Sequence, residues 1–277
     1  MNNGKIVFIG GGNMARSLIG GLVADGLPAA QIHVLDTQPA VLSNLQRDYK
    51  VQTHNDLASA VQSAEVIVLA VKPQQMQDAV KALSAVWPGN ALLISIAAGI
   101  RLDDLGRWLG HPDAAIVRAM PNTPSLVQAG ASALIANDAV SAQQREQAEA
   151  ILRAVGLAIW LNDETKMDAV TALSGSGPAY FFLVMEAMEN AAIELGLPQE
   201  TARLLCLETA FGAAKMALES DKSAVTLRQQ VTSPGGTTER AIHELEDGGL
   251  HGLFENALVA AALRARELGD QLGQDHE

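Results

Sequence analysis

Three consecutive glycines follow the first apolar run of the chain and could hold a dinucleotide. Gly10, Gly12 and Ala15 fit the pattern G-x-G-x-x-A, in which the first glycine permits a tight turn and the second lets a pyrophosphate approach the backbone. The phosphates would then lie at a helix N-terminus, where free N–H groups and the helix dipole favour anions. A glycine triplet alone is often only a turn, but here a strand pattern precedes it and a helix pattern follows. The sequence therefore predicts dinucleotide binding.

An acidic residue, Asp36, ends the second apolar run and could select the dinucleotide. A carboxylate at this place accepts the ribose hydroxyls of NAD and repels the 2′-phosphate of NADP. No arginine follows directly, because the next residues are Thr37 and Gln38. The alternative is that Asp36 only caps the following helix.

Two further residues are expected beside the cofactor. Lys72 lies in Ala70-Val71-Lys72-Pro73, at the end of a buried-strand pattern. Ligands of open α/β sheets bind beyond the carboxyl ends of the strands, so Lys72 could reach a ribose or the nicotinamide. It could equally be a solvated lysine at a strand end. Asn55 precedes a helix expected to begin near Asp56, where it could contact adenosine or simply be the N-cap.

Two segments of the C-terminal part join small residues and hydroxyls to a helix start, at 173–180 and 232–239. In the second, Gly235 and Gly236 are expected to expose backbone N–H groups, and Thr237 and Thr238 add donors. Such a group of donors can hold a carboxylate. The alternative is that both segments are capped turns between helices.

Composition excludes several other functions. The chain of 277 residues carries 19 Lys and Arg against 31 Asp and Glu, a formal charge of −12, which disfavours binding to nucleic acid. The six histidines lack the spacings of metal sites, so we expect no metal. Cys206, the single cysteine, excludes an internal disulfide and is expected in a helix core. Pro, Gly and Asn interrupt the uncharged runs, so we expect no membrane span and a soluble, cytoplasmic protein.

The elements that must position these residues divide the chain in two. Over residues 1–162, apolar runs typical of buried parallel strands alternate with amphipathic helix patterns such as Asn13–Asp25, Gln74–Val86 and Ala142–Ala154. The runs are Lys5–Gly10, Gln31–Asp36, Glu65–Val71, Ala91–Ile96, Ala114–Ala119, Ala131–Ala136 and Leu157–Leu161. This alternation predicts an α/β, Rossmann-like domain with a doubly wound, mostly parallel sheet.

Residues 163–277 show helix patterns only. These are Lys166–Leu173, Pro178–Leu195, Gln199–Ser220, Ala224–Val231, Pro234–Glu246 and Leu250–Leu268. The segment Ala179–Ala192 is apolar on nearly all sides, which indicates burial within its own domain or in a partner. We therefore predict an all-α C-terminal domain that binds substrate and dimerises.

The combination of segments resembles the pyrroline-5-carboxylate reductases. The resemblance rests on Gly10–Ala15, Val71–Pro73, Arg118–Pro124, Ser174–Tyr180 and Ser233–Thr238, and it covers nearly the whole chain. It implies a Rossmann-like domain, a helical domain that interlocks with a second subunit, and homodimers that often assemble as pentamers of dimers. The implied reaction is the reduction of L-1-pyrroline-5-carboxylate to L-proline by NADPH or NADH, the last step of proline biosynthesis.

The resemblance also implies roles for single residues. Gly236, Thr237 and Thr238 would hold the substrate, with Thr238 hydrogen-bonded to the ring nitrogen as the catalytic residue. A threonine hydroxyl has too high a pKa to be an efficient acid, so we expect Thr238 to position the substrate and to relay a proton. Glu164 would lie near the product, and Ser176 and Ser233 are expected in the same site.

The predicted cofactor contacts are Ile9, Gly10, Gly12, Asn13, Met14, Asp36, Asn55, Ala70, Val71, Lys72, Pro73 and Ala97. Many family members carry small polar or basic residues after the second strand, and Asp36 departs from that pattern. We therefore expect NADH to be used at least as well as NADPH.

Two other functions fit parts of this pattern. A related imine or β-hydroxyacid reductase with the same two-domain layout would use a lysine or aspartate near Lys166 and Asp168. A non-catalytic dinucleotide-binding protein would keep the fold without turnover, because fold alone does not establish function. The intact segment Ser233–Thr238 argues against the second alternative.

Overall fold

The computed structural model describes residues 4–275, which form two compact units. The sheet unit comprises the described residues up to Ser176 together with those from Ala260 onward, and the helical unit is Gly177–Val259. The compact units thus divide after Ser176 and again after Val259, whereas the change from strand patterns to helix patterns in the sequence predicts a division at residue 162. That functional division remains a prediction.

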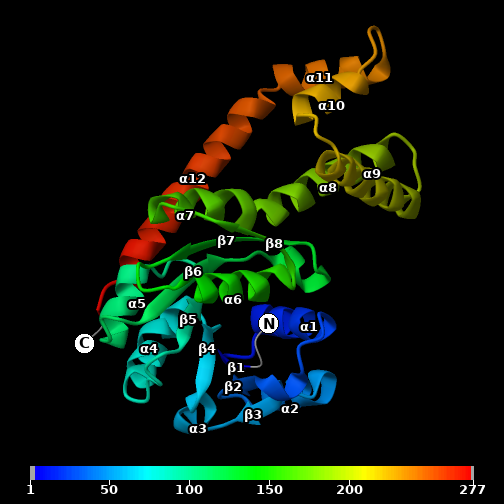
Figure 1. The fold of residues 1–277 in the computed structure, drawn as a ribbon. Coiled ribbons are helices and arrows are strands. Elements are labelled where there is room, and N and C mark those ends of the chain that lie inside the picture. Colours follow the sequence, from blue (N-terminus) through cyan, green and yellow to red (C-terminus); the bar gives the residue numbers. More distant parts are fainter. Residues whose placement is uncertain (1–3, 276–277) are drawn as a thin grey trace. The chain divides into compact units, whose positions relative to one another are not determined.

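The sheet unit contains one sheet of eight strands in the order β3-β2-β1-β4-β5-β6-β7-β8 (Figure 1). The strands are β1 (Lys5–Ile9), β2 (Ile32–Leu35), β3 (Gln52–His54), β4 (Ala64–Leu69), β5 (Leu92–Ser95), β6 (Ala115–Met120), β7 (Gly130–Ala136) and β8 (Gly156–Trp160). Every neighbouring pair is parallel except β6 and β7, which are antiparallel. The predicted mostly parallel, doubly wound sheet is therefore confirmed.

Helices cover both faces of this sheet, which explains the continuous apolar strands. Along β1, Ile6 and Phe8 belong to one core cluster and Val7 and Ile9 to the other, because successive side chains alternate between the faces. The first cluster includes residues of α1 (Asn13–Ala24), α2 (Pro39–Tyr49) and α6 (Ala142–Arg153). The second includes residues of α3 (Leu57–Val61), α4 (Met76–Ser84) and α5 (Leu102–Leu109).

Strand β3 is not among the predicted runs. Its three residues, Gln52, Thr53 and His54, pair only with β2 at the edge of the sheet. An edge strand buries little, so its sequence need not be apolar. The seven predicted runs each overlap one of the other strands.

The segment between β8 and the helical unit winds in three ways. A 3₁₀ turn at Glu164–Lys166 leads into α7 (Met167–Val170), and a π-helical turn follows at Thr171–Gly175. The predicted helical stretch Lys166–Leu173 is therefore confirmed, and the structure divides it into 3₁₀, α and π turns. Single π-turns often mark functional sites.

The helical unit contains α8 (Gly177–Glu194), α9 (Gln199–Glu219), α10 (Ala224–Gln230), α11 (Thr237–Asp247) and the start of α12 (Leu250–Leu272). Cys206 is buried, with its Sγ 3.6 Å from the Met185 carbonyl oxygen between α9 and α8, so its predicted core position is confirmed. Among residues 4–275, none of the helices combines the length and the apolar composition that a membrane span requires.

The end of α12 packs within the sheet unit beside α5 (Figure 1). Arg101 Nη2 donates to Asp270 Oδ1 at 2.6 Å, and Trp108 Nε1 donates to Asp275 Oδ1 at 2.8 Å. These bonds hold the end of α12 and the residues that follow it against the start and the end of α5.

Candidate functional site

The first glycine of the triplet is required by the backbone itself. Gly10 has φ +97°, and its N–H donates to the Leu35 carbonyl oxygen at 2.8 Å. A Cβ at this position would lie 2.6 Å from the carbonyl oxygen of Ala70. The predicted tight turn is therefore present, and it brings the loops after β1 and β4 together.

Neither the backbone angles nor the packing of the protein requires a glycine at the third position of the triplet. Gly12 is the N-cap of α1 with φ −66°, a value that any residue adopts, and a Cβ there would meet no atom within 4 Å. The space in front of this helix N-terminus is therefore open. An open, side-chain-free N-terminus fits a pyrophosphate, which needs close access to backbone N–H groups.

Asp36 is fixed against the same loop. Its Oδ2 accepts the N–H of Gly11 and its Oδ1 accepts the N–H of Gln38, both at 2.8 Å. Gln38, not Asp36, is the N-cap of α2, so the helix-cap alternative is wrong. The structure places a carboxylate beside the glycine loop, where the prediction for a ribose ligand requires it.

The other predicted cofactor residues follow neighbouring parallel strands. Ala70, directly after β4, donates its N–H to the Ile9 carbonyl oxygen at 2.8 Å, and Ala97 follows β5. Lys72 is exposed and is the N-cap of a short 3₁₀ turn. Asn55 is exposed directly after β3, and the helix N-cap is Asp56, whose carboxylate accepts the Ser59 N–H. Asn55 is thus not a cap, and the loops after β1, β4 and β5 meet at one edge.

A buried ion pair joins three segments near this edge. Arg118, whose side chain is only 4% exposed, donates from Nη1 to Oε1 of Glu164 at 2.8 Å. The same Oε1 accepts the N–H of Leu102 at 3.0 Å. Glu164 therefore connects β6, the start of α5 and the segment that leads to the helical unit. Its predicted place near the product remains a prediction.

Arg118 and Asn122 are residues to which sequence reasoning assigned no role. Asn122 is nine-tenths buried, and its amide contacts both the start of β7 and the π-helical turn. The charge of Arg118 within the apolar run Ala114–Ala119 is a signal that could have been used, since a buried charge needs a partner. Nothing local marks Asn122, because its partners lie far away in the sequence.

In the helical unit, the N–H donors of the two glycines before α11 are already hydrogen-bonded to acceptors of the chain itself. Gly235 has φ +73°, and its N–H donates to Oε2 of Glu239 at 2.7 Å, while the N–H of Gly236 donates to the Ser233 carbonyl oxygen at 3.0 Å. The expectation that both glycines expose their N–H groups is therefore wrong. The donors without an intrahelical acceptor are those of the first turn of α11, including Thr237 and Thr238.

The predicted helix Pro234–Glu246 accordingly begins later than expected. Gly236 is the N-cap and α11 starts at Thr237, because the positive φ of Gly235 cannot continue a helix. Ser176, the remaining predicted substrate residue, lies at the other end of the π-turn, where its N–H donates to the Thr171 carbonyl oxygen at 2.8 Å.

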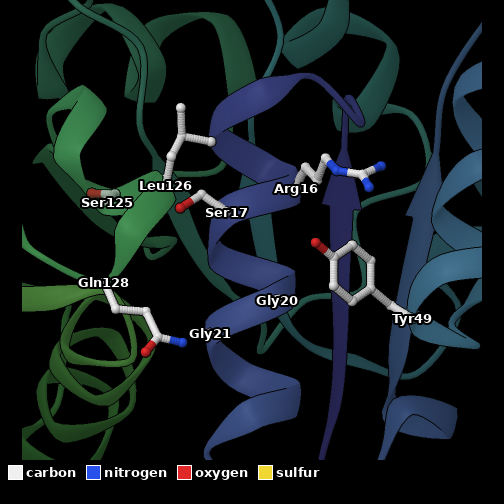
Figure 2. Close-up of a pocket in the computed structure, with 8 residues that line it drawn as sticks. All are labelled: Arg16, Ser17, Gly20, Gly21, Tyr49, Ser125, Leu126 and Gln128. Atoms are coloured by element: carbon white, nitrogen blue, oxygen red, sulfur yellow. The ribbon is translucent and has the colours of Figure 1, made fainter. Parts of the chain in front are cut away.

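A hollow of about 310 Å³ lies along α1, away from the predicted contacts. Figure 2 shows Arg16 and Tyr49 on one side of the helix and Ser125, Leu126 and Gln128 on the other. Asp48 pairs with the Arg16 guanidinium, so the hollow offers no uncompensated charge. Among the described residues, no group of three or more His, Cys, Asp or Glu side chains could hold a metal ion.

Two histidines lie side by side where β2 pairs with β3. His33 Nδ1 is 2.7 Å from His54 Nε2. Burial, reinforced by Lys5 and His54, lowers the pKa of His33 from 6.5 to about 4, and burial also lowers the pKa of His54. Both rings therefore resist protonation in the folded chain.

Comparison with known proteins identifies both parts of the chain. Residues 164–268 match the family model described as pyrroline-5-carboxylate reductase dimerisation. Residues 5–99 match the model described as NADP oxidoreductase, coenzyme F420-dependent. Along its length, the chain is similar to a pyrroline-5-carboxylate reductase of Pseudomonas aeruginosa, with 52% identity over 99% of this chain and 100% of that protein.

The chain belongs to the pyrroline-5-carboxylate reductase family. A solved pyrroline-5-carboxylate reductase of Coxiella burnetii is 49% identical, covers 96% of this chain and 99% of its own, and superimposes with a TM-score of 0.93. A pyrroline carboxylate reductase of Plasmodium falciparum, solved with NADP bound, is 27% identical over 97% of this chain and 99% of its own, with a TM-score of 0.86. The predicted membership of the pyrroline-5-carboxylate reductase family is confirmed, and the dimerisation match supports the predicted homo-oligomer.

Proposed function

We propose that this chain reduces L-1-pyrroline-5-carboxylate to L-proline with a reduced nicotinamide dinucleotide. The proposal is carried by one observation: a chain related over its full length to a pyrroline-5-carboxylate reductase keeps both the open glycine loop and the hydroxyl-rich turn at Ser233–Thr238. An oxidoreductase of this kind needs a dinucleotide and a small carboxylate substrate, and these two features supply donors for each.

The residues present fit a dinucleotide. The first turn of α1 offers unshielded N–H groups to the pyrophosphate because Gly12 leaves the space before it open. The loops after β4 and β5, with Val71, Lys72, Pro73 and Ala97, lie at the same sheet edge. When bound, the reduced dinucleotide supplies the hydride that the imine carbon accepts.

The substrate carboxylate is assigned to the first turn of α11. The N–H groups of Thr237 and Thr238 have no intrahelical acceptor, and a helix N-terminus favours an anion. Glu239 already accepts the Gly235 N–H, so a bound carboxylate uses the threonine donors or displaces this side chain. Either arrangement orients the ring relative to Thr238.

Thr238 acts on the ring nitrogen. When the imine carbon is reduced, the nitrogen gains electron density and must carry a proton. A protonated imine is already electrophilic, so the chain needs no strong acid at this point. The Thr238 hydroxyl holds the nitrogen in place and relays a proton, and orientation of this kind contributes about 7–11 kcal/mol in well-aligned reactions.

The choice of dinucleotide follows from Asp36. Its carboxylate is held at the glycine loop by Gly11 and Gln38, so it is positioned to accept ribose hydroxyls and to repel a 2′-phosphate. NADH is therefore used at least as well as NADPH. Asp36→Ser removes the charge and should shift the ratio of kcat/KM values toward NADPH by about tenfold, the equivalent of 1.4 kcal/mol. An unchanged ratio would contradict this assignment.

The proposal extends to the oligomeric state and the cellular location of the enzyme. The helical unit forms a homodimer, dimers associate as pentamers of dimers, and the enzyme acts in the cytoplasm. Light scattering at several concentrations distinguishes a species of two chains from one of ten.

A related reductase that relies on Lys166 or Asp168 is the other enzyme to be tested. In the sheet unit, Asp168 Oδ2 lies 3.6 Å from Arg266 Nε on α12, so its charge already has a partner. This pairing, together with the full-length family relationship, favours reduction of the cyclic imine.

The test is turnover with identified product. The chain is incubated with pyrroline-5-carboxylate and either NADH or NADPH, and L-proline is measured together with the loss of reduced-nicotinamide absorbance. Equal amounts of dinucleotide oxidised and L-proline formed support the proposal. Dinucleotide binding by folded protein without any proline would contradict it, and turnover of a β-hydroxyacid in the same assay would favour the related reductase.

A further inference from the structure

The side chain of Asn122 bridges two segments that are far apart in the sequence. Its Oδ1 accepts the N–H of Ala131, at the start of β7, at 2.9 Å. Its Nδ2 donates to the carbonyl oxygen of Ser174, inside the π-helical turn, at 3.0 Å. Both partners lie in the sheet unit, and Asn122 itself is nine-tenths buried.

The Ser174 carbonyl has a specific need for this donor. In an α-helix it would accept the N–H of the residue four positions later, which is Pro178. Proline has no N–H, so that bond cannot form. Asn122 supplies an N–H from another element, which satisfies the carbonyl and also ties it to a fixed point.

That fixed point lies at the cofactor edge of the sheet. Strand β6 is parallel to β5, so β6 ends at the same edge of the sheet as the loops that carry Ala97 and Gly10. The last residue of β6 is Met120, and Asn122 lies two residues after it. Met120 packs against the same π-turn, since a Cβ on Gly175 would lie 2.6 Å from Met120 Cε. The end of β6 therefore contacts the turn through both a hydrogen bond and close packing.

Only one residue separates the π-turn from the start of the helical unit. Ser176, bonded through its N–H to the Thr171 carbonyl oxygen, is the last residue of the sheet unit, and α8 begins at Gly177. The position of Ser176, a predicted substrate residue at the end of the sheet unit, thus depends on the Ser174 anchor.

We propose that Asn122 is a positioning residue for hydride transfer, because its amide fixes the Ser174–Ser176 segment, which ends at a predicted substrate residue, to the edge of the sheet that holds the dinucleotide. Asn122 acts through Ser174, the residue to which its amide donates. The inference rests on the proposed reductase function and adds to it a residue that sets reaction geometry. Losing such a fixed point lowers kcat more than it weakens dinucleotide binding.

Two variants separate the donor from the rest of the side chain. Asn122→Asp has nearly the same shape and keeps the acceptor for the Ala131 N–H, but its ionised carboxylate cannot donate to Ser174. Asn122→Ala loses both bonds at every pH. Only the carboxyl of Asn122→Asp regains a donor when it is protonated, so lowering the pH restores the missing bond in one variant alone.

The measurement is kcat for pyrroline-5-carboxylate, divided by the wild-type value at the same pH, with dinucleotide affinity measured separately. At about pH 8, both variants should lose about 10- to 100-fold in kcat with dinucleotide Kd within about twofold, as expected for a misplacement of about 1 Å. Toward about pH 5, nearer the ordinary pKa of a carboxyl group, the ratio should recover at least about threefold for N122D and stay flat for N122A.

Wild-type kcat in N122D at about pH 8, or equal losses in both variants at every pH, would overturn the proposal, because a general packing defect does not depend on the donor. If N122A does not fold, N122D carries the test, since it keeps the bond to β7. Hydrogen exchange provides a readout that needs no turnover: amides of Ser176 and the first turn of α8 should exchange faster in N122D. Absent turnover in the wild type would defeat the proposed function, whereas unchanged exchange would defeat the anchor.

Discussion

The sheet unit and the helical unit use apolar side chains in opposite ways. In the sheet unit, Val7 and Phe8 of β1 are fully buried, since helices cover both faces of the strand. On α8, Phe181 and Phe182 remain 68% and 64% exposed in the single chain. The sheet unit thus completes its core with its own helices, whereas the helical faces need a second copy, as the dimerisation match indicates. Predictions that separate the two units test this contrast.

The largest effect is expected on the exposed face of α8. Phe182→Asp should abolish the dimer at micromolar concentration, because burying a phenylalanine contributes roughly 1.5–3 kcal/mol and a two-fold interface contains it twice. A buried carboxylate adds a desolvation cost. Sedimentation equilibrium measures the change.

The control is Val127→Asp, an equally drastic change at an exposed residue outside the matched region 164–268. It should leave the assembly intact. Dissociation by both variants, or by neither, would contradict the assignment of dimerisation to the helical unit.

The next effect is expected at the hydroxyl of the α11 turn. Thr238→Ala should lower kcat by about 100-fold or more, the usual effect of removing a group that acts on the reacting atoms. Dinucleotide affinity should not change, because the glycine loop belongs to the sheet unit. Thr238→Ser keeps the hydroxyl and should retain most of the activity. Full activity in Thr238→Ala would remove the residue from the mechanism.

A smaller effect is expected at the glycine loop, where two neighbouring glycines should respond differently. Gly12→Ala should leave the melting temperature unchanged, since its Cβ would meet nothing, but should raise the dinucleotide Kd by about tenfold, or 1.4 kcal/mol. Gly10→Ala should instead destabilise the fold, because Gly10 has φ +97° and its Cβ would lie 2.6 Å from the Ala70 carbonyl oxygen. Calorimetry and fluorescence titration separate the two results. Equal loss of stability in both variants would show that Gly12 serves packing.

The smallest effect is expected on the pH dependence of stability, through His33 in β2. Since the pKa of His33 falls from 6.5 to about 4 on folding, the unfolded chain takes up the proton first, so stability is complete above pH 6.5 and decreases as the pH falls toward 4. His33→Asn should flatten this part of the stability profile in urea unfolding. An unchanged slope in His33→Asn would rule out this source of acid sensitivity.

The sequence predicts the sheet better than its edges. Strands such as β1 and β4 are buried on both faces and must be apolar, so their composition alone reveals them. Strand β3 has one neighbour and a polar sequence, and only its pairing with β2 makes it a strand. Pro178 indicates that the α-helical bond of Ser174 is lost, but the contacts of the π-turn at Thr171–Gly175 with Met120 and Asn122 come from residues far away in the sequence.

In the candidate site too, features set by local sequence can be predicted, whereas features set by distant contacts cannot. The role of Gly10 follows from a local turn, and the structure shows that turn. By contrast, the bond from Gly11 to Asp36 and the occupation of the Gly235 N–H by Glu239 depend on how side chains fold back onto the chain. Spacing along the sequence predicts which residues gather at the edge of the sheet, but not which donors are already used.

The central claim is that the sheet unit binds the dinucleotide and the helical unit binds the substrate. Its most direct test is a set of initial rates with pyrroline-5-carboxylate and both dinucleotides, measured in parallel for the wild type, Gly12→Ala and Thr238→Ala. We expect turnover by the wild type, a raised KM for the dinucleotide in Gly12→Ala only, and a lowered kcat with normal dinucleotide binding in Thr238→Ala only. Absence of turnover in the wild type, or the same kinetic parameter altered by both variants, would contradict it.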